Sequence, residues 1–317
     1  MVLKAQCCNA CKMFFRRVIT FRTPITPCER SEECFEPPIR NFECRSCRFQ
    51  KCIIAGMIHN QERFDVPGTL NQLSQLEYHR RQLFENFQPI RSFSFDESTS
   101  GDTVGFIMKT TVFDSYDWEV MSQLTTMNFL RQLDFTRMLT SQDLRAFLKG
   151  AYLNSAILST AMHWFLLNSQ SIFHPGGLDV CPKEMDIINA FNPNFEVGIK
   201  CRLIGKLAEL KVTREEFLLL SIIFACYPGS PGISKTGNLL LHSYQKVYSN
   251  LLFTHCQMTT QQAAPSRFTE LLSICETIAK TKQDISNVAL LLKVYQPGIQ
   301  WKEMLRGAIE YLLDSNI

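Results

Sequence analysis

Apolar residues recur at helical spacing through most of the chain after about residue 105. Positions three and four residues apart are apolar in successive segments, which is typical of helices that bury one face. The predicted helices are residues 116–133, 141–167, 213–227, 237–256, 265–281 and 285–295. Breakers rich in Pro, Gly or Asn lie at 174–177, 191–194 and 228–232. The pattern predicts an all-α, multilayer helical domain over residues 105–317.

A more polar zone precedes this domain and predicts a linker. It contains one amphipathic segment, residues 70–87, with Leu and Phe at helical spacing. The segment that follows, residues 90–105, is rich in Ser, Thr, Asp and Gly, a composition typical of flexible connections. We therefore expect a hinge over residues 64–104 between the helical domain and an N-terminal module, residues 1–63.

Composition is that of a multidomain protein without a membrane span. Of the 317 residues, 45% are hydrophobic, which is enough for a large core. The longest apolar run, residues 217–227, is about half of the roughly 20 residues that a membrane-spanning helix needs. The first residues lack the apolar stretch of a secretory signal. We expect no membrane contact and reduced thiols.

Cysteine is concentrated in the N-terminal module, where eight of the 13 cysteines fall within the first 52 residues. Where thiols stay reduced, such a cluster indicates metal binding rather than disulfides. The spacing Cx5Cx9CxxC joins Cys28, Cys34, Cys44 and Cys47. Four thiolates suit tetrahedral zinc, so we predict a zinc site at these residues. A further CxxC pair, Cys8 and Cys11, supplies two more candidate zinc ligands.

The module is also basic. Residues 1–63 carry eleven Lys and Arg against six Glu, a net charge of +5, so they could neutralise phosphates. A cationic helix is predicted directly after Cys11. Its core side would hold Phe14, Phe15, Val18 and Phe21. Its outward side would carry Lys12, Arg16 and Arg17. A cationic helix anchored at its start by a metal site is suited to a DNA groove.

Three linked motifs resemble the DNA-binding domain of nuclear hormone receptors, particularly the expanded nematode set. They are CNACKMFFRR (8–17), the Cx5Cx9CxxC set and CRSCRFQKCIIAGM (44–57). The resemblance implies that the helix near Cys11 lies in the major groove of double-stranded DNA. It implies base-reading positions at Asn9, Ala10, Lys12, Met13 and Arg17. It implies phosphate contacts from Arg16, Arg40 and Arg48, and a buried Cys52 that binds no metal.

The first zinc site departs from the family pattern. That site uses a second CxxC pair about a dozen residues upstream, and only seven residues precede Cys8 here. Zinc supplies roughly 10 kcal/mol or more of folding free energy to small modules, so we expect one complete zinc site and a less ordered reading helix. The alternatives are a shortened isoform that dimerises with other receptors without binding DNA, and a zinc module for protein contacts, as in RING or LIM domains.

Residues 129–150, FLRQLDFTRMLTSQDLRAFLKG, resemble part of the receptor ligand-binding domain. Such a domain would enclose a mostly apolar cavity for a lipophilic small molecule. Candidate lining residues are Phe129, Leu133, Met138, Leu153, Ile157 and Met162. The alternative for each is an ordinary core position. A protein that binds lipid constitutively is a third interpretation of the whole chain.

Residues 300–307, QWKEMLRG, approximate the family's activation helix, with Gln300 departing from the pattern. The resemblance implies that Glu303 and Arg131 grip the two ends of a coactivator or corepressor helix, with Lys149 as a second basic contact. The alternative for Glu303 is a solvated charge. Residues 267–281 resemble the helix through which receptors form homodimers or heterodimers, although helical spacing does not separate a dimer stripe from core.

Enzyme signatures are weak. Residues 231–238 suggest a phosphate-binding loop, but Asn238 stands where that loop needs Lys. The histidines are isolated and have no catalytic spacing. The leading hypothesis is a nuclear transcription factor and not an enzyme. It would bind DNA through a zinc module, and a lipophilic ligand and coactivators through a helical domain.

Overall fold

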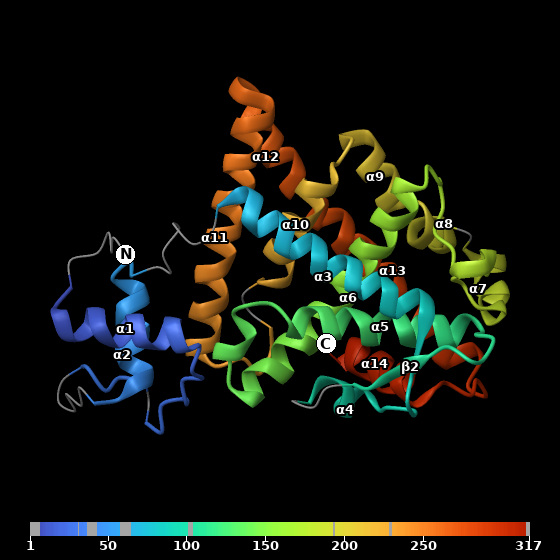
Figure 1. Ribbon diagram of the computed structural model, residues 1–317. Coiled ribbons are helices and arrows are strands. Elements are labelled where there is room, and N and C mark those ends of the chain that lie inside the picture. The colour runs from blue at the N-terminus through green and yellow to red at the C-terminus, as the bar shows by residue number, and fades with distance from the viewer. Residues whose placement is uncertain are drawn as a thin grey trace.

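The computed structural model describes residues 7–30, 32–36, 43–57, 65–100, 104–192, 194–227 and 230–314. They form a small module and a larger helical domain beside it (Figure 1). In the module, α1 (Asn9–Phe21) crosses α2 (Arg45–Ile54). Phe15 of α1 stacks on Phe49 of α2 with ring centroids 5.7 Å apart. Both rings are buried, so this pair is the centre of the module's small core.

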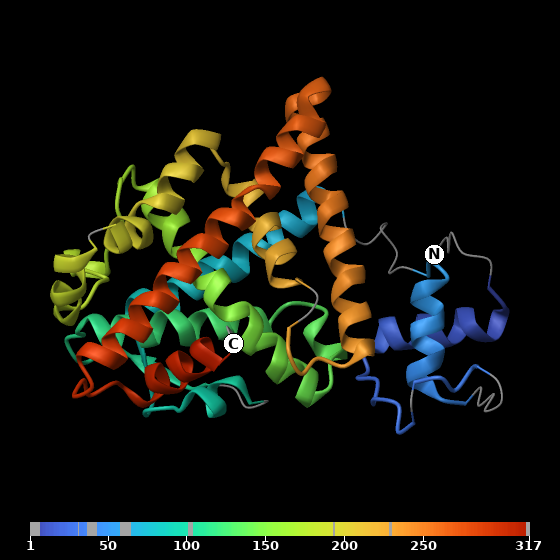
Figure 2. The same cartoon turned by 180° about the vertical axis from the view of Figure 1, so that it is seen from behind.

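The helical domain has three layers, and its middle layer is apolar on several sides. α3 (Val66–Asn86) and α5 (Ser115–Arg131) form one face, with α3 in front in Figure 1. α13 (Ile274–Tyr295) lies on the opposite face, in front in Figure 2. Between them are α6 (Ser141–Leu166), α10 (Arg214–Ala225) and α11 (Lys235–Thr260). α10 is buried from residue 216 to 223, as expected for a helix covered on opposite sides.

Shorter elements connect these helices. The short helices are α4 (Phe95–Thr99), α7 (Asp186–Phe191), α8 (Asn194–Lys200), α9 (Arg202–Leu210), α12 (Ala264–Leu272) and α14 (Glu303–Asp314). Single 3-10 turns lie at Thr136–Met138, Pro175–Gly177, Lys183–Met185 and Gln261–Ala263. β1 (Phe87–Pro89) pairs antiparallel with β2 (Phe106–Met108), with Gln88 opposite Ile107. In the described ranges, none of the helices has the length and apolar character needed to cross a bilayer.

The long predicted helices are confirmed, with one change near the C-terminus. The sequence predicted separate helices at 265–281 and 285–295, but the chain divides at another place. Instead α12 ends at Leu272, and α13 runs without interruption from Ile274 to Tyr295. The Ser273 N–H bonds to carbonyls of the last turn of α12, so the turn closes there and the next helix starts at once. Sequence patterning did not predict the short helices α7, α8 and α9. The breaker at 191–194 lies between α7 and α8.

Within the expected hinge, residues 65–100 are folded, and the prediction of a flexible connection there is wrong. α3 packs on α5 and α10, and its Leu73 is buried. Residues 94–100 contain α4, which begins with a capping box. The Ser94 hydroxyl accepts from the Glu97 N–H at 3.2 Å, and the Glu97 carboxylate accepts from the Ser94 N–H at 2.8 Å. Ser94, one of the polar residues that suggested a linker, thus caps the start of this helix.

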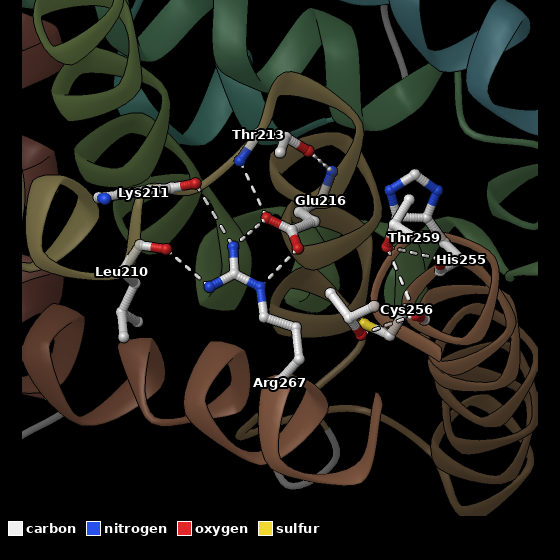
Figure 3. A network of polar contacts seen from close by, with 9 residues as sticks. Leu210, Lys211, Thr213, Glu216, His255, Cys256, Thr259 and Arg267 are labelled. Atoms are coloured by element: carbon white, nitrogen blue, oxygen red, sulfur yellow. Dashed lines mark hydrogen bonds and ion pairs between the residues drawn. The ribbon is translucent and has the colours of Figure 1, made fainter. Parts of the chain in front are cut away.

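A buried ion pair joins α12 to α10 (Figure 3). Arg267 donates through Nε to Oε1 of Glu216 at 2.7 Å and through Nη2 to Oε2 at 2.5 Å. Its Nη1 donates to the carbonyl of Leu210 at 2.6 Å. Glu216 is only 2% exposed and also caps α10 with Thr213. This bidentate, charge-assisted pair supplies hydrogen bonds to a carboxylate that water cannot reach.

Polar contacts also fix the module against the helical domain, where α2 lies beside α11 (Figure 1). The Thr236 hydroxyl on α11 is 2.7 Å from the Ser46 hydroxyl and accepts from Gln50 Nε2 at 2.9 Å. Arg22, just after α1, pairs with Asp134 at 2.9 Å. The contacts at Thr236 are buried, so they are protected from competition by water.

Candidate functional site

Four cysteine sulfurs gather at one point in the module. The Sγ atoms of Cys28, Cys34, Cys44 and Cys47 all lie within 4.8 Å of one another. Cys44 is the N-cap of α2 and Cys47 lies in its first turn, so the start of the helix holds two of the four ligands. Four soft sulfurs at this separation suit a tetrahedral zinc ion. The cysteines are positioned to bind zinc, as the spacing predicted.

Burial and neighbouring thiols set the acidity of this cluster. Burial raises the pKa of the Cys47 thiol to about 12. Burial also raises the pKa of Cys28, but hydrogen bonds from the Arg30 and Glu32 N–H groups and from the Cys34 and Cys44 thiols together outweigh it and lower that pKa to about 7. Zinc binds thiolates, so metal binding must displace the protons that the less acidic thiols retain. Zinc affinity should therefore weaken as the pH falls.

The second CxxC pair has a different setting. The Cys8 sulfur caps α1 by accepting from the Cys11 N–H at 3.4 Å. In the described part of the module, neither residue joins a group of three or more metal-binding side chains. Their assignment as zinc ligands stays a prediction. Cys52 is 3% exposed and lies outside the four-sulfur cluster, in agreement with its expected packing role.

α1 turns one side to the core and the other to solvent. Phe15 and Val18 are each 1% exposed on the core side. The predicted DNA-contacting residues on this helix are all exposed, namely Asn9, Ala10, Lys12, Met13, Arg16 and Arg17. The Arg48 guanidinium of α2 lies 4.6 Å from the centre of the Phe14 ring, which holds its charge beside α1. Arg40 lies outside the described residues.

The sequence pattern wrongly predicted one residue of α1, Phe21, to be in the core. Phe21 is 73% exposed, and Ile19 is buried in its stead. Phe21 is the last residue of α1, and Arg22 follows it with a left-handed backbone (φ 47°) that turns the chain away. Helical spacing therefore stops predicting burial at this position.

A cavity of about 370 Å³ lies within the helical domain, between α3, α5, α6, α9, α13 and α14. Its apolar lining includes Leu153, Ile157, Leu203, Val288 and Leu305. This size and lining are typical of sites for lipophilic small molecules. α14 forms part of the cavity wall.

The sequence identified the cavity lining only in part. Leu153 and Ile157 line it, as predicted. Four other predicted lining residues, Phe129, Leu133, Met138 and Met162, do not line it and are buried in the core. Both α5 and α6 bury residues on several sides, so helical spacing does not tell which side faces the cavity.

A carboxyl group stands among the apolar walls of the cavity. Glu119 of α5 accepts a hydrogen bond from Gln123 Nε2 at 2.9 Å, and both residues line the cavity. Burial raises the pKa of Glu119 despite this hydrogen bond. The Oε1 atom of Gln123 is buried and has no hydrogen-bond partner in the described ranges. The pair therefore places polar groups in a mostly apolar lining. Sequence patterning did not identify this pair, because it marked only the apolar positions of α5.

The three predicted clamp residues lie on three helices that all contact α4. Arg131, at the end of α5, donates through Nη2 to the carbonyls of Ser98 and Ser100. Lys149 of α6 pairs with Asp96 at 2.6 Å. Glu303 is exposed at the start of α14. The structure thus brings Arg131 and Lys149 to α4, and does not place either in contact with Glu303.

Comparisons with known proteins agree with both units. Residues 2–59 match the double treble clef zinc finger of the C4 type, and residues 98–295 match the ligand-binding domain of nuclear hormone receptor. The chain is 34% identical over 312 residues to nuclear hormone receptor family member nhr-27 of Caenorhabditis elegans, covering 97% of this chain and 88% of that protein. Family member nhr-167 of the same organism is 33% identical over 319 residues, covering 96% and 92%.

These matches extend over both units that the structure describes, the module with the four-cysteine cluster and the helical domain with the cavity. Proteins of this family are transcription factors, which agrees with the weak enzyme signatures in the sequence. The protein belongs to the nuclear hormone receptor family and is a ligand-regulated transcription factor, not an enzyme.

Proposed function

We propose that the protein recognises a specific DNA element in the nucleus by placing α1 in the major groove. The exposed residues of α1 support this, because they combine cations with small and apolar side chains at the surface. Asn9, Ala10, Lys12, Met13 and Arg17 would face base edges. Arg16, Arg40 and Arg48 would contact phosphates. The four-cysteine zinc site supports α2, whose Phe49 packs against Phe15 of α1 and so holds the helix in place.

Replacement of Arg17 by Ala should weaken specific DNA binding more than non-specific binding. The target duplex would first be selected from random sequences, because no element is assigned. A lost base contact should then cost about 1–3 kcal/mol against the selected duplex, with a smaller loss against scrambled DNA at the same salt. Lys246→Ala, which removes an exposed charge from α11, is the matched control. Equal losses on both duplexes would remove the base-reading role of Arg17.

A receptor that dimerises without reading DNA is the second candidate. The observation that favours it is that Cys8 and Cys11 lie outside any described metal cluster. Residues 267–281 on α12 and α13 would form the dimer contact, although Arg267 itself points inward to Glu216. Failure of the full chain to select any duplex, together with concentration-dependent binding to an intact receptor, would favour this function.

We further propose that the cavity takes a lipophilic molecule with a hydrogen-bond donor, such as a hydroxyl group. Glu119 and Gln123 support this choice, because both add polar groups to a mostly apolar lining. The cations of the lining are already paired: Arg80 with Glu77 at 2.6 Å, Arg81 with Glu85 at 3.4 Å, and Lys200 with Asp179 at 2.5 Å. A ligand carboxylate would meet Glu119 without a cation to offset it, so a donor is the better match.

A long-chain alcohol should therefore stabilise the protein more than the fatty acid of the same length. Near a hundredfold excess over Kd, a bound ligand raises the free energy of unfolding by about 2.7 kcal/mol, seen as a higher Tm. Ile157→Trp should remove the effect by filling the cavity. Ile187→Trp, at a partly exposed position outside the lining, is the control. A larger Tm increase with the acid would contradict the proposed ligand chemistry.

The third part of the proposed function is a clamp for coactivator or corepressor helices. Glu303 would bind the N–H groups at one end of such a helix, and Arg131 would bind the carbonyls at its other end. Lys149 would add a basic contact. The contacts that Arg131 makes with two carbonyls support this role, since they show its side chain within reach of a helix end.

A further inference from the structure

α4 is the tip of a loop closed by a β-stem. β1 and β2 pair at its base, and the Ile90 N–H donates to the Gly105 carbonyl at 3.0 Å just beyond the paired residues. From this stem the loop reaches across to α5, α6 and α14, all of which contact α4. Figure 1 shows α4 lying against α14 near β2. A five-residue helix is unstable alone, so these contacts hold it in shape.

The polar contacts of α4 are those that a bound partner helix would make. Arg131 binds the carbonyls of Ser98 and Ser100 at the C-terminal end of α4. These carbonyls carry the negative end of the helix dipole and lack partners within the helix. Lys149 binds Asp96 at 2.6 Å. Both basic residues of the proposed clamp are therefore engaged by the chain's own helix.

The apolar contacts of α4 also resemble those of a bound partner helix. Phe95 is 3% exposed and lies between two aromatic rings, with centroids 5.2 Å from Tyr152 of α6 and 5.6 Å from Tyr311 of α14. The Ser98 hydroxyl is 3.0 Å from Met304 Sδ on α14. A single apolar side chain of α4 thus fills the space between α6 and α14, as an anchor residue of an amphipathic helix would.

We propose that α4 is an internal occupant of the clamp groove, the surface between Arg131, Lys149 and α14, and that partner helices bind by displacing it. The proposal rests on the clamp proposed above. The stem keeps α4 at high effective concentration, so it competes with any free helix without forming a tight contact of its own. Glu303 is exposed at the start of α14, where an incoming helix could reach it.

The test compares the full chain with a variant whose residues 94–100 are replaced by Gly and Ser, leaving the stem intact. The probe is a fluorescent peptide with an LxxLL pattern, titrated by anisotropy. We expect the variant to bind at least about tenfold more tightly, because the tethered competitor is gone. Adding Glu303→Ala to the variant should reverse most of the gain. Ser92→Ala, at an exposed site in the same loop, should leave affinity unchanged.

Each result separates the two proposals. Equal affinity of the natural chain and the variant, with sensitivity to Glu303→Ala, overturns the α4 proposal and leaves the clamp. Absence of peptide binding in both overturns the clamp and the α4 proposal with it.

Hydrogen exchange in the natural chain gives a second readout that needs no folded variant. Saturating peptide should increase exchange of the Ser98 and Ser100 amides, whose bonds to the Ser94 and Asp96 carbonyls would break. Protection that persists with the peptide bound would overturn the proposal.

Discussion

Replacement of Cys34 by Ser is expected to abolish specific DNA binding while leaving the helical domain folded. Cys34 is 1% exposed at the centre of the four-sulfur cluster, and a hydroxyl there would replace a zinc-binding thiolate. Zinc supplies roughly 10 kcal/mol or more to the folding of small modules, which is more than the Phe15–Phe49 core could replace. Affinity for the selected duplex should fall by about a thousandfold or more, to the non-specific level.

The measurement combines zinc content by native mass spectrometry with DNA titration at fixed salt. A chelator added to the natural chain should reproduce the loss, and returned zinc should reverse it. Cys275→Ser, at an exposed cysteine of α13, is the matched control and should change neither quantity. Unaltered specific binding by Cys34→Ser would show that the zinc cluster does not support the DNA-reading surface.

The long helices and the zinc cluster could be predicted because each depends on local spacing. α6 and α11 follow their predicted bounds to within a few residues, since Thr140 and Ser234 cap the starts that the pattern marked. Cys44 and Cys47 come together because both lie at the start of one helix. These features require little knowledge of what packs against them.

Features that depend on tertiary neighbours could not be predicted in the same way. The polar composition around α4 led to the prediction of a linker there. Its capping box, Ser94 followed by Glu97, is present in the sequence and could have predicted the helix. Phe95 is buried only because Tyr152 and Tyr311 flank it from distant helices. The cavity lining likewise depends on which sides of α5 and α6 face a gap rather than another helix.

The ion pair between Arg267 and Glu216 has the largest expected effect on the helical domain. Arg267→Ala should lower its free energy of unfolding by about 3–5 kcal/mol, because it leaves a carboxylate that is 2% exposed without a partner. The Leu210 carbonyl would also lose its donor, which removes a hydrogen bond between α12 and the end of α9 (Figure 3). Urea unfolding followed by circular dichroism measures the change.

Two further variants test whether the stranded charge accounts for this loss. Arg267→Met combined with Glu216→Gln keeps similar volumes and removes both charges, so it should recover much of the stability. Lys280→Ala breaks an exposed pair with Glu276 on α13 and should have no measurable effect, because water already solvates both groups. Equal stability of Arg267→Ala and the double variant would contradict the stranded-charge explanation, because removing the unpaired carboxylate would then recover nothing.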